Sequence, residues 1–452
     1  MNLRSRKIMC KRQRHSSACS DEIKEEEDII STLPDALLTL ILSFLPDADA
    51  NRTRILSNRW KDIWAFLPNL HLVMPFCWSI EEVNKFHDSV DQIIALRGGL
   101  HIKRFHLYCS QKCDYNRVYD WLCTVVKCKV QEIELRFPAD RFTFKFCWSL
   151  FKSCNTLVEL TLKGEFVLDV PEAEFLFPCL KKLNLVSIVY SSDQSLTHLI
   201  SGCPVLEELF VERQVIGRSD NLQTFKVSSL SLKRLKTSFA LCVLGDYKVV
   251  IDAPNLEYIY IVDVISTHYT FTKPLSLVEA HIKTRPDINS NVILTTLNSA
   301  KKFTLTYSTL MALHHADVLE IPMFHNLVKF EIGIDSRFGW ILLPDLLESM
   351  PNLEHITFLD GLVPFVRAQH TFNMAWDPTM YMPECLRCKL KEITIRNQEA
   401  ITQEEFPLIR YLLRNSFRLQ KLSMNAHKIN PKIRRQLLRF PRGSAFCRIE
   451  FI

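Results

Sequence analysis

The 452-residue sequence predicts a chain of the α+β or α/β class, in which a small three-helix segment precedes a solenoid of stacked parallel strands. Two observations support this prediction. An apolar-x-x-apolar-x-apolar pattern returns from about residue 100 to the end of the chain at a short, nearly regular interval. Ahead of it, residues 28–70 contain apolar residues at helical spacing, interrupted by prolines and capping residues.

The composition is that of a large folded chain without a glycine-rich phosphate loop. The sequence is 47% hydrophobic, so a large core is available, and it contains only 10 glycines. Its 15 cysteines follow no framework spacing, and no apolar stretch follows the basic N-terminus. We therefore expect no signal peptide, reduced thiols, and a location in the nucleus, the cytoplasm or both. The longest apolar run, 36–45, is about half a bilayer span, so no membrane association is expected.

Residues 1–27 predict a disordered arm, because a basic block is followed by an acidic block without aromatic residues. The basic block holds the lysines and arginines of positions 4–14, and residues 21–28 are mostly Glu and Asp. The basic block is typical both of a nuclear localisation signal and of a solvated tail with no role, and both interpretations stay open. Basic residues without interleaved aromatic residues disfavour specific nucleic-acid binding.

Residues 28–70 predict three short helices around a small core. Pro34 suits the first helical position, where its missing N–H costs nothing, and Pro46 ends that helix. Asp47 can cap a second helix, and Ser57 can cap a third. The apolar residues of the first and third helices are Leu37, Leu38, Ile41, Leu42 and Leu45, then Trp60, Ile63, Trp64 and Leu67. Such a core leaves Leu33 and the outer leucines partly exposed, which on a small domain indicates a partner.

This stretch resembles the F-box, most closely the plant type, through Leu33-Pro34-Asp35, the run 37–46, and Leu56-Ser57-x-Arg59-Trp60-x-x-x-Trp64. It departs from the family at the Asp-Ala-Asp-Ala of 47–50 and at Asn51. The resemblance implies docking onto a Skp-type linker protein that bridges to a cullin. The expected linker interface comprises Leu33, Pro34, Leu37, Leu38, Ile41, Leu42 and Leu45, with Arg59, Trp60 and Trp64 shaping its base. The alternative is a three-helix lobe that packs only on its own chain.

The solenoid prediction covers residues 71–380, and its strand pattern continues beyond them. Copies of the pattern include Ile102, Val130, Leu157, Leu180, Leu206, Leu232, Leu256, Leu277, Phe303, Leu327, Leu353, Leu390 and Leu419. The leucines at 157, 180, 206, 232 and 256 lie 23 to 26 residues apart, which is within the range of leucine-rich repeats.

The pattern has a simple physical basis. Its second and third apolar positions are two residues apart, so both face the same side of a short strand. A single repeat cannot close its own core, so neighbouring repeats stack and their strands pair in parallel. We expect short helices or irregular turns on the convex side, a loop over 361–382, and no asparagine ladder. The array resembles the irregular leucine-rich repeats that accompany plant F-boxes; the alternative is a set of unrelated parallel strands.

Residues 381–452 predict a C-terminal cap. Thr402-x-x-Glu405 is a capping box that opens a helix, on which Arg410, Arg414 and Arg418 should share one face. The further elements are a helix through Ile433, Leu437 and Leu438 and a final strand over Cys447–Ile452. This segment resembles the FBD domain, which follows F-box and repeat regions in plant proteins. Its basic face indicates either an acidic partner or a solvated helix surface.

Motifs for catalysis are missing from the sequence. It contains no nucleotide-binding glycine loop, no serine-hydrolase elbow and no H-E-x-x-H. Cys385-x-x-Cys388 has no second ligand pair, and His314-His315-x-Asp317 would place adjacent imidazoles about 100° apart on a helix. We therefore expect a non-enzymatic protein without catalytic residues, metal or cofactor.

Three functional hypotheses follow. In the first, the chain is the substrate-recognition adaptor of a Skp–cullin–F-box ubiquitin ligase, with the repeats binding a protein substrate. In the second, the chain is a leucine-rich-repeat scaffold outside any ligase, and the F-box lobe only caps the repeats. In the third, the arm and the basic C-terminal helix bind nucleic acid, which would give a steep salt dependence. The identity of the substrate does not follow, because exposed side chains between the strand leucines obey no code.

Overall fold

The computed structural model describes residues 29–74, 79–109, 113–138, 144–145, 148–164, 166–172, 177–213, 221–239, 247–285, 290–315, 321–334, 337–362, 382–396, 401, 403–425 and 429–452. It contains two compact units, Met1–Trp64 and Ala65–Ile452, and each has its own internal structure. The arm predicted for residues 1–27 and most of the loop predicted for 361–382 lie outside the described residues.

The first unit contains the three predicted helices and one additional helical turn. Its elements are α1 (Ile29–Thr32), α2 (Asp35–Ser43), α3 (Asp47–Arg52), the 3-10 helix η1 (Thr53–Ile55) and α4 (Asn58–Ala65). Pro34 is the N-cap of α2 and not its first helical residue, because its ψ of 147° is extended. Its carbonyl nevertheless accepts from the backbone N–H of Leu37 and Leu38. The Ser57 hydroxyl accepts from the Trp60 N–H at 3.4 Å, which confirms its predicted role as a cap.

The second unit is a solenoid around one parallel sheet. The described residues place 15 strands in this main sheet, in the order β1-β2-β3-β5-β7-β9-β11-β13-β15-β16-β17-β18-β19-β20-β21. The strands are β1 (Asn69–Val73), β2 (Arg104–Tyr108), β3 (Glu132–Arg136), β5 (Glu159–Lys163), β7 (Lys182–Val186), β9 (Glu208–Arg213), β11 (Arg234–Phe239), β13 (Tyr258–Asp263), β15 (Glu279–Thr284), β16 (Lys302–Leu305), β17 (Lys329–Ile332), β18 (His355–Phe358), β19 (Glu392–Ile395), β20 (Lys421–Met424) and β21 (Arg448–Phe451). Every predicted copy of the pattern, and the predicted final strand, lies in this sheet, which confirms the solenoid.

Strand β1 was missed by the sequence prediction. Leu67-x-x-Leu70-x-Leu72 is a further copy of the pattern, but it directly follows the third helix and was counted with the three-helix segment. Its backbone pairs in parallel with β2, from Asn69 opposite Arg104 to Val73 opposite Tyr108. The repeat pattern therefore begins about 35 residues earlier than expected.

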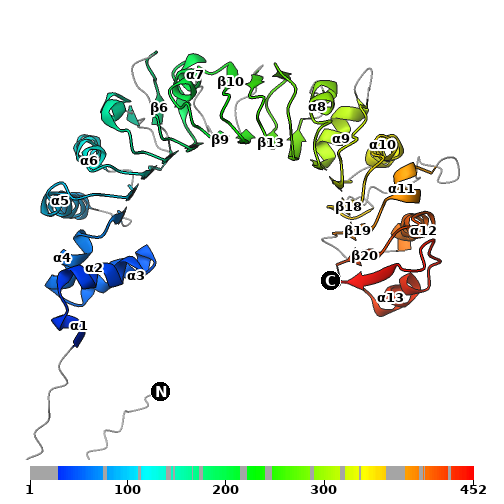
Figure 1. Ribbon diagram of the computed structural model, residues 1–452, viewed down its shortest axis with the longest axis horizontal. Helices are drawn as coiled ribbons and strands as arrows, with labels where there is room; N and C mark the ends of the chain where they lie inside the picture. The colour runs from blue at the N-terminus through cyan, green and yellow to red at the C-terminus, as the bar shows by residue number, and fades with distance from the viewer. Residues whose placement is uncertain are drawn as a thin grey trace, which may run out of the picture. The chain divides into compact units, whose positions relative to one another are not determined.

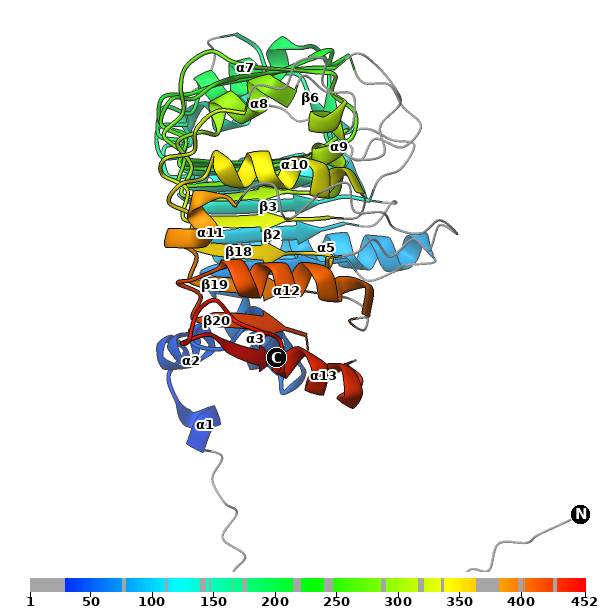
Figure 2. The same ribbon diagram turned by 90° about the vertical axis from the view of Figure 1, so that its right-hand side faces the viewer.

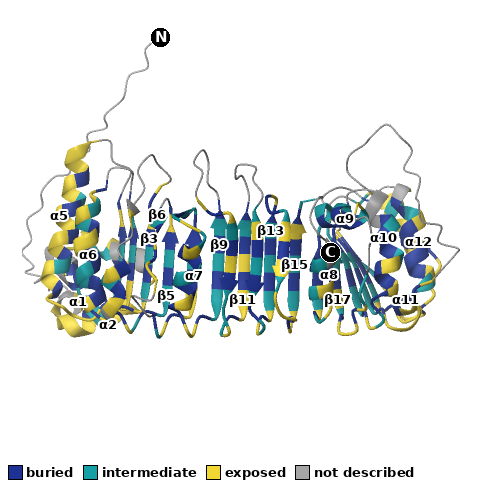
Figure 3. Cartoon of the chain, turned by 90° about the horizontal axis from the view of Figure 1, so that it is seen from above, coloured by how far each residue is buried: buried dark blue, intermediate teal, exposed yellow. Residues whose placement is uncertain are grey.

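Strand register keeps the leucines of successive repeats in line. Leu160 pairs with Leu183 and Leu162 with Leu185, and all four side chains are fully buried. The residues between them face the other side of the sheet, as the alternation of colours along β9 and β11 in Figure 3 shows. Burial of each leucine contributes roughly 1.5–3 kcal/mol relative to an exposed leucine. A shift of register by one residue would expose the whole row, so the leucine pattern specifies the pairing.

Helices cover the outer side of the main sheet (Figure 1). They are α5 (Ile80–Arg97), α6 (Tyr115–Lys127), η2 (Trp148–Ser153), α7 (Gln194–Ser201), α8 (Ser290–Thr296), α9 (Tyr307–His314), α10 (Arg337–Glu348), α11 (Glu384–Cys388), η3 (Gln403–Glu405), α12 (Phe406–Asn415) and α13 (Pro431–Leu438). In Figure 2, α10, α11 and α12 lie one below another on the near side of the main sheet, with α12 at the height of β19. The opposite, concave face of the main sheet carries none of these helices.

The middle of the solenoid departs from the expected helices and irregular turns. Two additional three-stranded parallel sheets lie outside the main sheet there, in the orders β4-β6-β8 and β10-β12-β14. Their strands are β4 (Phe144–Lys145), β6 (Phe166–Leu168), β8 (Val189–Tyr190), β10 (Thr224–Ser228), β12 (Lys248–Asp252) and β14 (His268–Phe271). The physical reason is pairing between repeats: β10 and β12 pair in parallel, and the β-branched residues Val249, Val250 and Ile251 of β12 favour a strand.

Neighbouring repeats are joined by side chains at the turn before each strand. The Thr156 and Ser231 hydroxyls donate to the carbonyls of Val130 and Leu206 at 2.8 and 2.9 Å. The Asn255 amide donates to the Leu230 carbonyl at 2.7 Å. These bonds satisfy carbonyls that a regular asparagine ladder would satisfy in other repeat proteins, so mixed hydroxyl and amide donors take over that role here.

The C-terminal elements are as predicted in type, with two differences. Thr402 lies outside the described residues, and the Glu405 carboxylate accepts from the Leu362 N–H at 3.4 Å. Arg410 and Arg414 lie on α12, but the helix ends at Asn415, so Arg418 does not continue their row. The second helix, α13, is capped by the Asn430 side chain, which accepts from the Lys432 N–H at 2.9 Å.

A buried histidine makes the N-terminal repeats sensitive to acid. His87 on α5 is buried, and its Nε2 accepts from the Asp114 N–H at 3.4 Å and lies 3.6 Å from the Cys113 Sγ. Burial, with help from Arg117, lowers the pKa of His87 below its ordinary value of 6.5, although Asp88, Asp91 and Asp114 oppose this shift. The unfolded chain therefore binds this proton more readily than the folded chain, and stability falls as the pH drops below 6.5.

Protonation of His87 is expected to lower the free energy of unfolding by at most about 1.4 kcal/mol for each pH unit of acidification. We expect His87→Gln, which keeps a polar acceptor but does not titrate, to show a smaller loss between pH 7.5 and pH 5.5. Urea midpoints at both pH values measure the difference. An identical pH dependence in both proteins would contradict the assignment.

Candidate partner-binding surfaces

Helix α2 presents one apolar row to solvent and a second row to the core. The side chains of Leu37 and Ile41 are 46% and 45% exposed, and Leu45, just beyond the helix, is also exposed. Leu38 and Leu42 are 0% and 1% exposed. Adjacent residues of a helix point about 100° apart, so consecutive leucines cannot share one surface. The prediction that Leu38 and Leu42 contact a linker is therefore corrected: both belong to the core.

The base of this unit is built from the third helix, α4. Trp60, Ile63 and Trp64 are buried. The Arg54 guanidinium lies 4.5 Å from the centre of the Trp64 ring, and burial lowers the pKa of Arg54. The two tryptophans therefore support the unit from inside and do not themselves form an exposed contact surface.

Arg59 ties the start of α2 to α4. Its Nη2 lies 2.7 Å and its Nε 3.0 Å from the Asp35 Oδ1, and Nη2 also donates to the Leu33 carbonyl. These Arg59 hydrogen bonds hold the Leu33-Pro34 turn, in which Leu33 is half-buried and Pro34 is exposed. Because the ion pair is exposed, its contribution to stability is about 0–1 kcal/mol, and its main effect is on orientation.

Sequence reasoning missed several exposed apolar residues. Phe44 is 79% exposed and Leu40 is also exposed, so Leu37, Leu40, Ile41, Phe44 and Leu45 form what we call the α2 apolar face. The signal was present, because positions 37, 40, 41 and 44 follow helical spacing on one side. Ile55 and Leu56 before α4 are exposed as well. A face of this size on a small unit is typical of a protein interface.

The second candidate surface is the concave face of the main sheet. At the N-terminal strands basic and acidic side chains are paired: the Arg104 guanidinium lies 3.0 Å from the Glu132 carboxylate, the His106 Nε2 is hydrogen-bonded to Glu132 at 2.8 Å, and Arg136 pairs with Glu134. Further along the sheet, aromatic residues take the same positions. Phe210, Tyr258 and Tyr260 are all half-exposed on this face.

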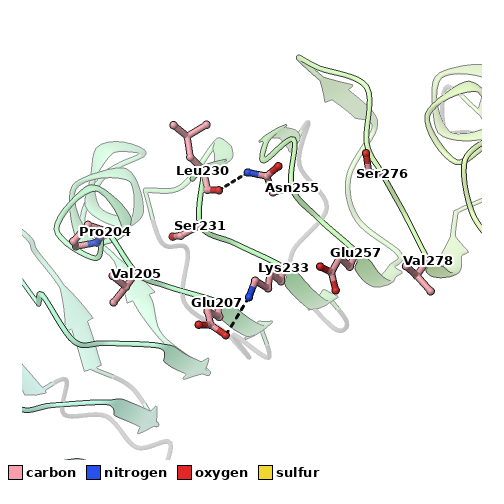
Figure 4. Close-up of a pocket in the computed structure, with 10 residues that line it drawn as sticks. All are labelled: Pro204, Val205, Glu207, Leu230, Ser231, Lys233, Asn255, Glu257, Ser276 and Val278. Carbon is pink, nitrogen blue, oxygen red and sulfur yellow. Dashed lines mark hydrogen bonds and ion pairs between the residues drawn. The ribbon is translucent and has the colours of Figure 1, made fainter.

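A hollow of about 680 Å³ opens where strands β9, β11, β13 and β15 begin (Figure 4). Its lining includes the exposed apolar side chains of Val205, Leu230 and Val278. The Lys233 Nζ lies 3.7 Å from the Glu207 carboxylate, as the dashed line in Figure 4 marks. The hollow is therefore amphipathic and borders the aromatic part of the concave face.

The two cysteines of the Cys385-x-x-Cys388 motif have different environments. Cys385 is buried, its Sγ donates to the Leu347 carbonyl at 3.3 Å, and burial raises its pKa to about 12, whereas Cys388 is exposed. Within the described ranges, no group of three or more His, Cys, Asp or Glu side chains is arranged to hold a metal ion. None of the helices in the described part of the chain has the length and apolarity needed to cross a bilayer.

Comparison with known proteins agrees with this architecture. The F-box domain model matches residues 30–72, the model for the LRR repeats of FBD-associated F-box protein At5g56370 matches 118–282, and the FBD model matches 378–424. The F-box/LRR-repeat protein At3g59190 of Arabidopsis thaliana is 32% identical over 381 residues, which cover 75% of this chain and 96% of that protein. The FBD-associated F-box proteins At5g18780 and At5g22730 of the same plant are 28% and 30% identical. Each match covers 94% of this chain, and 98% and 94% of the respective relatives.

Fold and surfaces together define a leucine-rich-repeat protein whose first unit carries an exposed apolar helix and whose second unit has a long concave sheet face. The chain belongs to the plant F-box/FBD/LRR-repeat family.

Proposed function

We propose that this chain is the substrate-recognition subunit of a Skp–cullin–F-box ubiquitin ligase. The α2 apolar face is the observation that carries this proposal, since five apolar side chains within nine residues are exposed. F-box domains typically bind a Skp-type linker, and the F-box match over 30–72 includes the whole face. Leu33 and Pro34, held by Arg59, would extend the interface beyond the face, and buried Leu38, Leu42, Trp60 and Trp64 would keep its shape.

In this role the chain performs no chemistry itself. The linker joins it to a cullin, and the repeat solenoid holds a protein substrate close to the ubiquitin-charged subunit. Tethering raises the effective concentration of substrate lysines at the reacting thioester, and other subunits catalyse the transfer. We also propose that the protein works in the nucleus, the cytoplasm or both, where such ligases meet their substrates.

The test is substitution of two exposed face residues, Ile41→Asp together with Phe44→Asp. Buried contacts of this kind often cost 2 kcal/mol or more per residue, so co-purification with a Skp-type linker should be lost. The control is Leu230→Asp, which places a single aspartate on an exposed leucine of the solenoid. Retained linker binding by the double variant, with circular dichroism unchanged, would contradict the proposal.

A scaffold outside any ligase is the second candidate, and one observation favours it. Helix α3 (Asp47–Arg52) is polar throughout except for its two alanines, and an Arg52–Asp49 ion pair at 3.0 Å lies on its surface. If α3 lacks contacts that the linker requires, the chain would not enter a ligase. Co-precipitation of a cullin with the chain and the linker separates the two candidates.

A further inference from the structure

One cross-strand row on β9, β11, β13 and β15 brings aromatic and basic residues together on the concave face. Phe210, Lys236, Tyr260 and His281 lie opposite one another on β9, β11, β13 and β15. Tyr258 and Lys283 stand two residues away on the same face. These six residues form what we call the central patch. In the strands that follow, the same row carries Thr304, Glu331 and Thr357, so the aromatic character ends at β15.

Three of the aromatic rings of the central patch make ring or cation contacts. The Tyr260 and His281 rings stack with centroids 4.4 Å apart and an interplanar angle of 8°. The Lys236 Nζ and the Arg234 Cζ lie 5.5 and 5.9 Å from the centre of the Tyr258 ring. Stacked and cation-bound rings lose little further freedom on binding, which makes them suitable contacts for an apolar side chain.

The uncompensated charge of the central patch is positive. Neither Lys236 nor Lys283 has a carboxylate within ion-pair distance among the residues that the structure describes, and both are exposed. The neighbouring acids are already engaged: Glu208 with Lys182 and Arg234 at 3.8 and 3.9 Å, and Glu279 with Lys302 at 2.9 Å. Glu212, in the cross-strand row of Lys283, also has an interaction partner. The N-terminal part of the concave face differs, because there each of Arg104, His106 and Arg136 has a glutamate partner.

These observations indicate the chemistry of the occupant. Two unpaired ammonium groups fit carboxylates, and the rings between them fit an aromatic or aliphatic side chain. A continuous phosphate backbone fits less well, because it carries a negative charge at every unit and the central patch offers only two exposed lysines, Lys236 and Lys283. The hollow at the start of the same strands leaves space for a peptide to continue past the rim.

We propose that the central patch binds an extended acidic segment of the substrate protein, in which glutamate or aspartate flanks an apolar or aromatic residue. This inference rests on the proposed function only in naming the occupant as a ubiquitination substrate. The lysines pair with the acidic side chains, and the Tyr260–His281 stack receives the central residue.

The test uses the full chain and a fluorescein-labelled Gly/Ser peptide with a central Glu-Phe-Glu, followed by fluorescence anisotropy. The comparison peptides carry Gln-Phe-Gln, Lys-Phe-Lys or Glu-Gly-Glu, and a single-stranded RNA is the competing ligand. We expect selective binding of Glu-Phe-Glu, weakened about tenfold or more in Lys236→Glu with Lys283→Glu. Tyr260→Ala should weaken Glu-Phe-Glu but leave any residual Glu-Gly-Glu binding unchanged.

The control is Lys226→Glu, the same substitution at one exposed lysine of β10, outside the main sheet. Thermal melts verify that each variant is folded. Equal binding of all peptides, an unchanged affinity in the double variant, or preference for RNA would overturn the proposal. Because the titration contains no linker, a failure here leaves the linker experiment intact, and loss of linker binding leaves this one intact.

Discussion

Substituting Leu38 with alanine is expected to unfold the first unit and to leave the repeat solenoid folded. Leu38 is fully buried on α2, and truncation of a buried leucine costs about 2–5 kcal/mol. A unit whose described helices span only residues 29–64 has a small core and a small stability margin. The loss therefore exceeds what this unit can tolerate, whereas the large core of the second unit is untouched.

Hydrogen exchange with mass spectrometry measures the effect in each unit separately. Peptides covering α4 should lose protection in Leu38→Ala, while peptides covering β9 to β15 keep theirs. The control is Leu37→Ala, one residue away and 46% exposed, which should retain the protection of α4 and weaken only linker binding. Full protection of α4 in the Leu38 variant would contradict the assignment of this residue to the core.

The second large effect is expected at Asp263, a carboxylate buried at the end of β13. Its Oδ1 accepts from the backbone N–H groups of Ile265 and Ser266 at 2.8 and 2.9 Å, and its Oδ2 accepts from the Tyr269 hydroxyl at 2.5 Å. Asp263→Ala leaves these donors buried without an acceptor. We expect a loss of about 3–5 kcal/mol, since each orphaned buried donor costs roughly 1–3 kcal/mol.

Urea unfolding, together with hydrogen exchange of β13 and β14, checks this value. Asp252→Ala is the control, because Asp252 also ends a strand and accepts from Thr272 and Ser228, but at a partly exposed site. Its expected cost is below about 1 kcal/mol. Similar urea midpoints for the two variants would show that the Asp263 network does not stabilise the turn.

The repeats were predictable because their signal is local and redundant. Leu160 and Leu162 specify a short strand by themselves, and the same spacing returns in each neighbouring repeat. The outer segments carry a weaker signal. The stretch that forms β10 could not be told from an irregular turn, because its strand becomes stable only when β12 pairs with it.

The sequence predicted that the residues of α2 are apolar and grouped, but it did not predict which of them face solvent and which face the core. Helical spacing identified Leu37, Leu38, Ile41 and Leu42 as one apolar group, and only the packed unit divides them into exposed and buried pairs. Phe44 was overlooked for the same reason, since a phenylalanine beside a helix end is compatible with either side. The Arg59–Asp35 contact joins residues 24 positions apart, a distance at which local patterns carry no information.

The sequence by itself determined the parallel solenoid, the three-helix unit and the family resemblance, because apolar periodicity acts on neighbours along the chain. Only the tertiary structure decided which charges remain unpaired on the concave face. Cross-strand partners such as Lys302 and Glu279 are 23 residues apart, and their distance depends on strand register and side-chain packing. The free lysines of the central patch follow from that arrangement, since an ion pair forms through space and not through sequence.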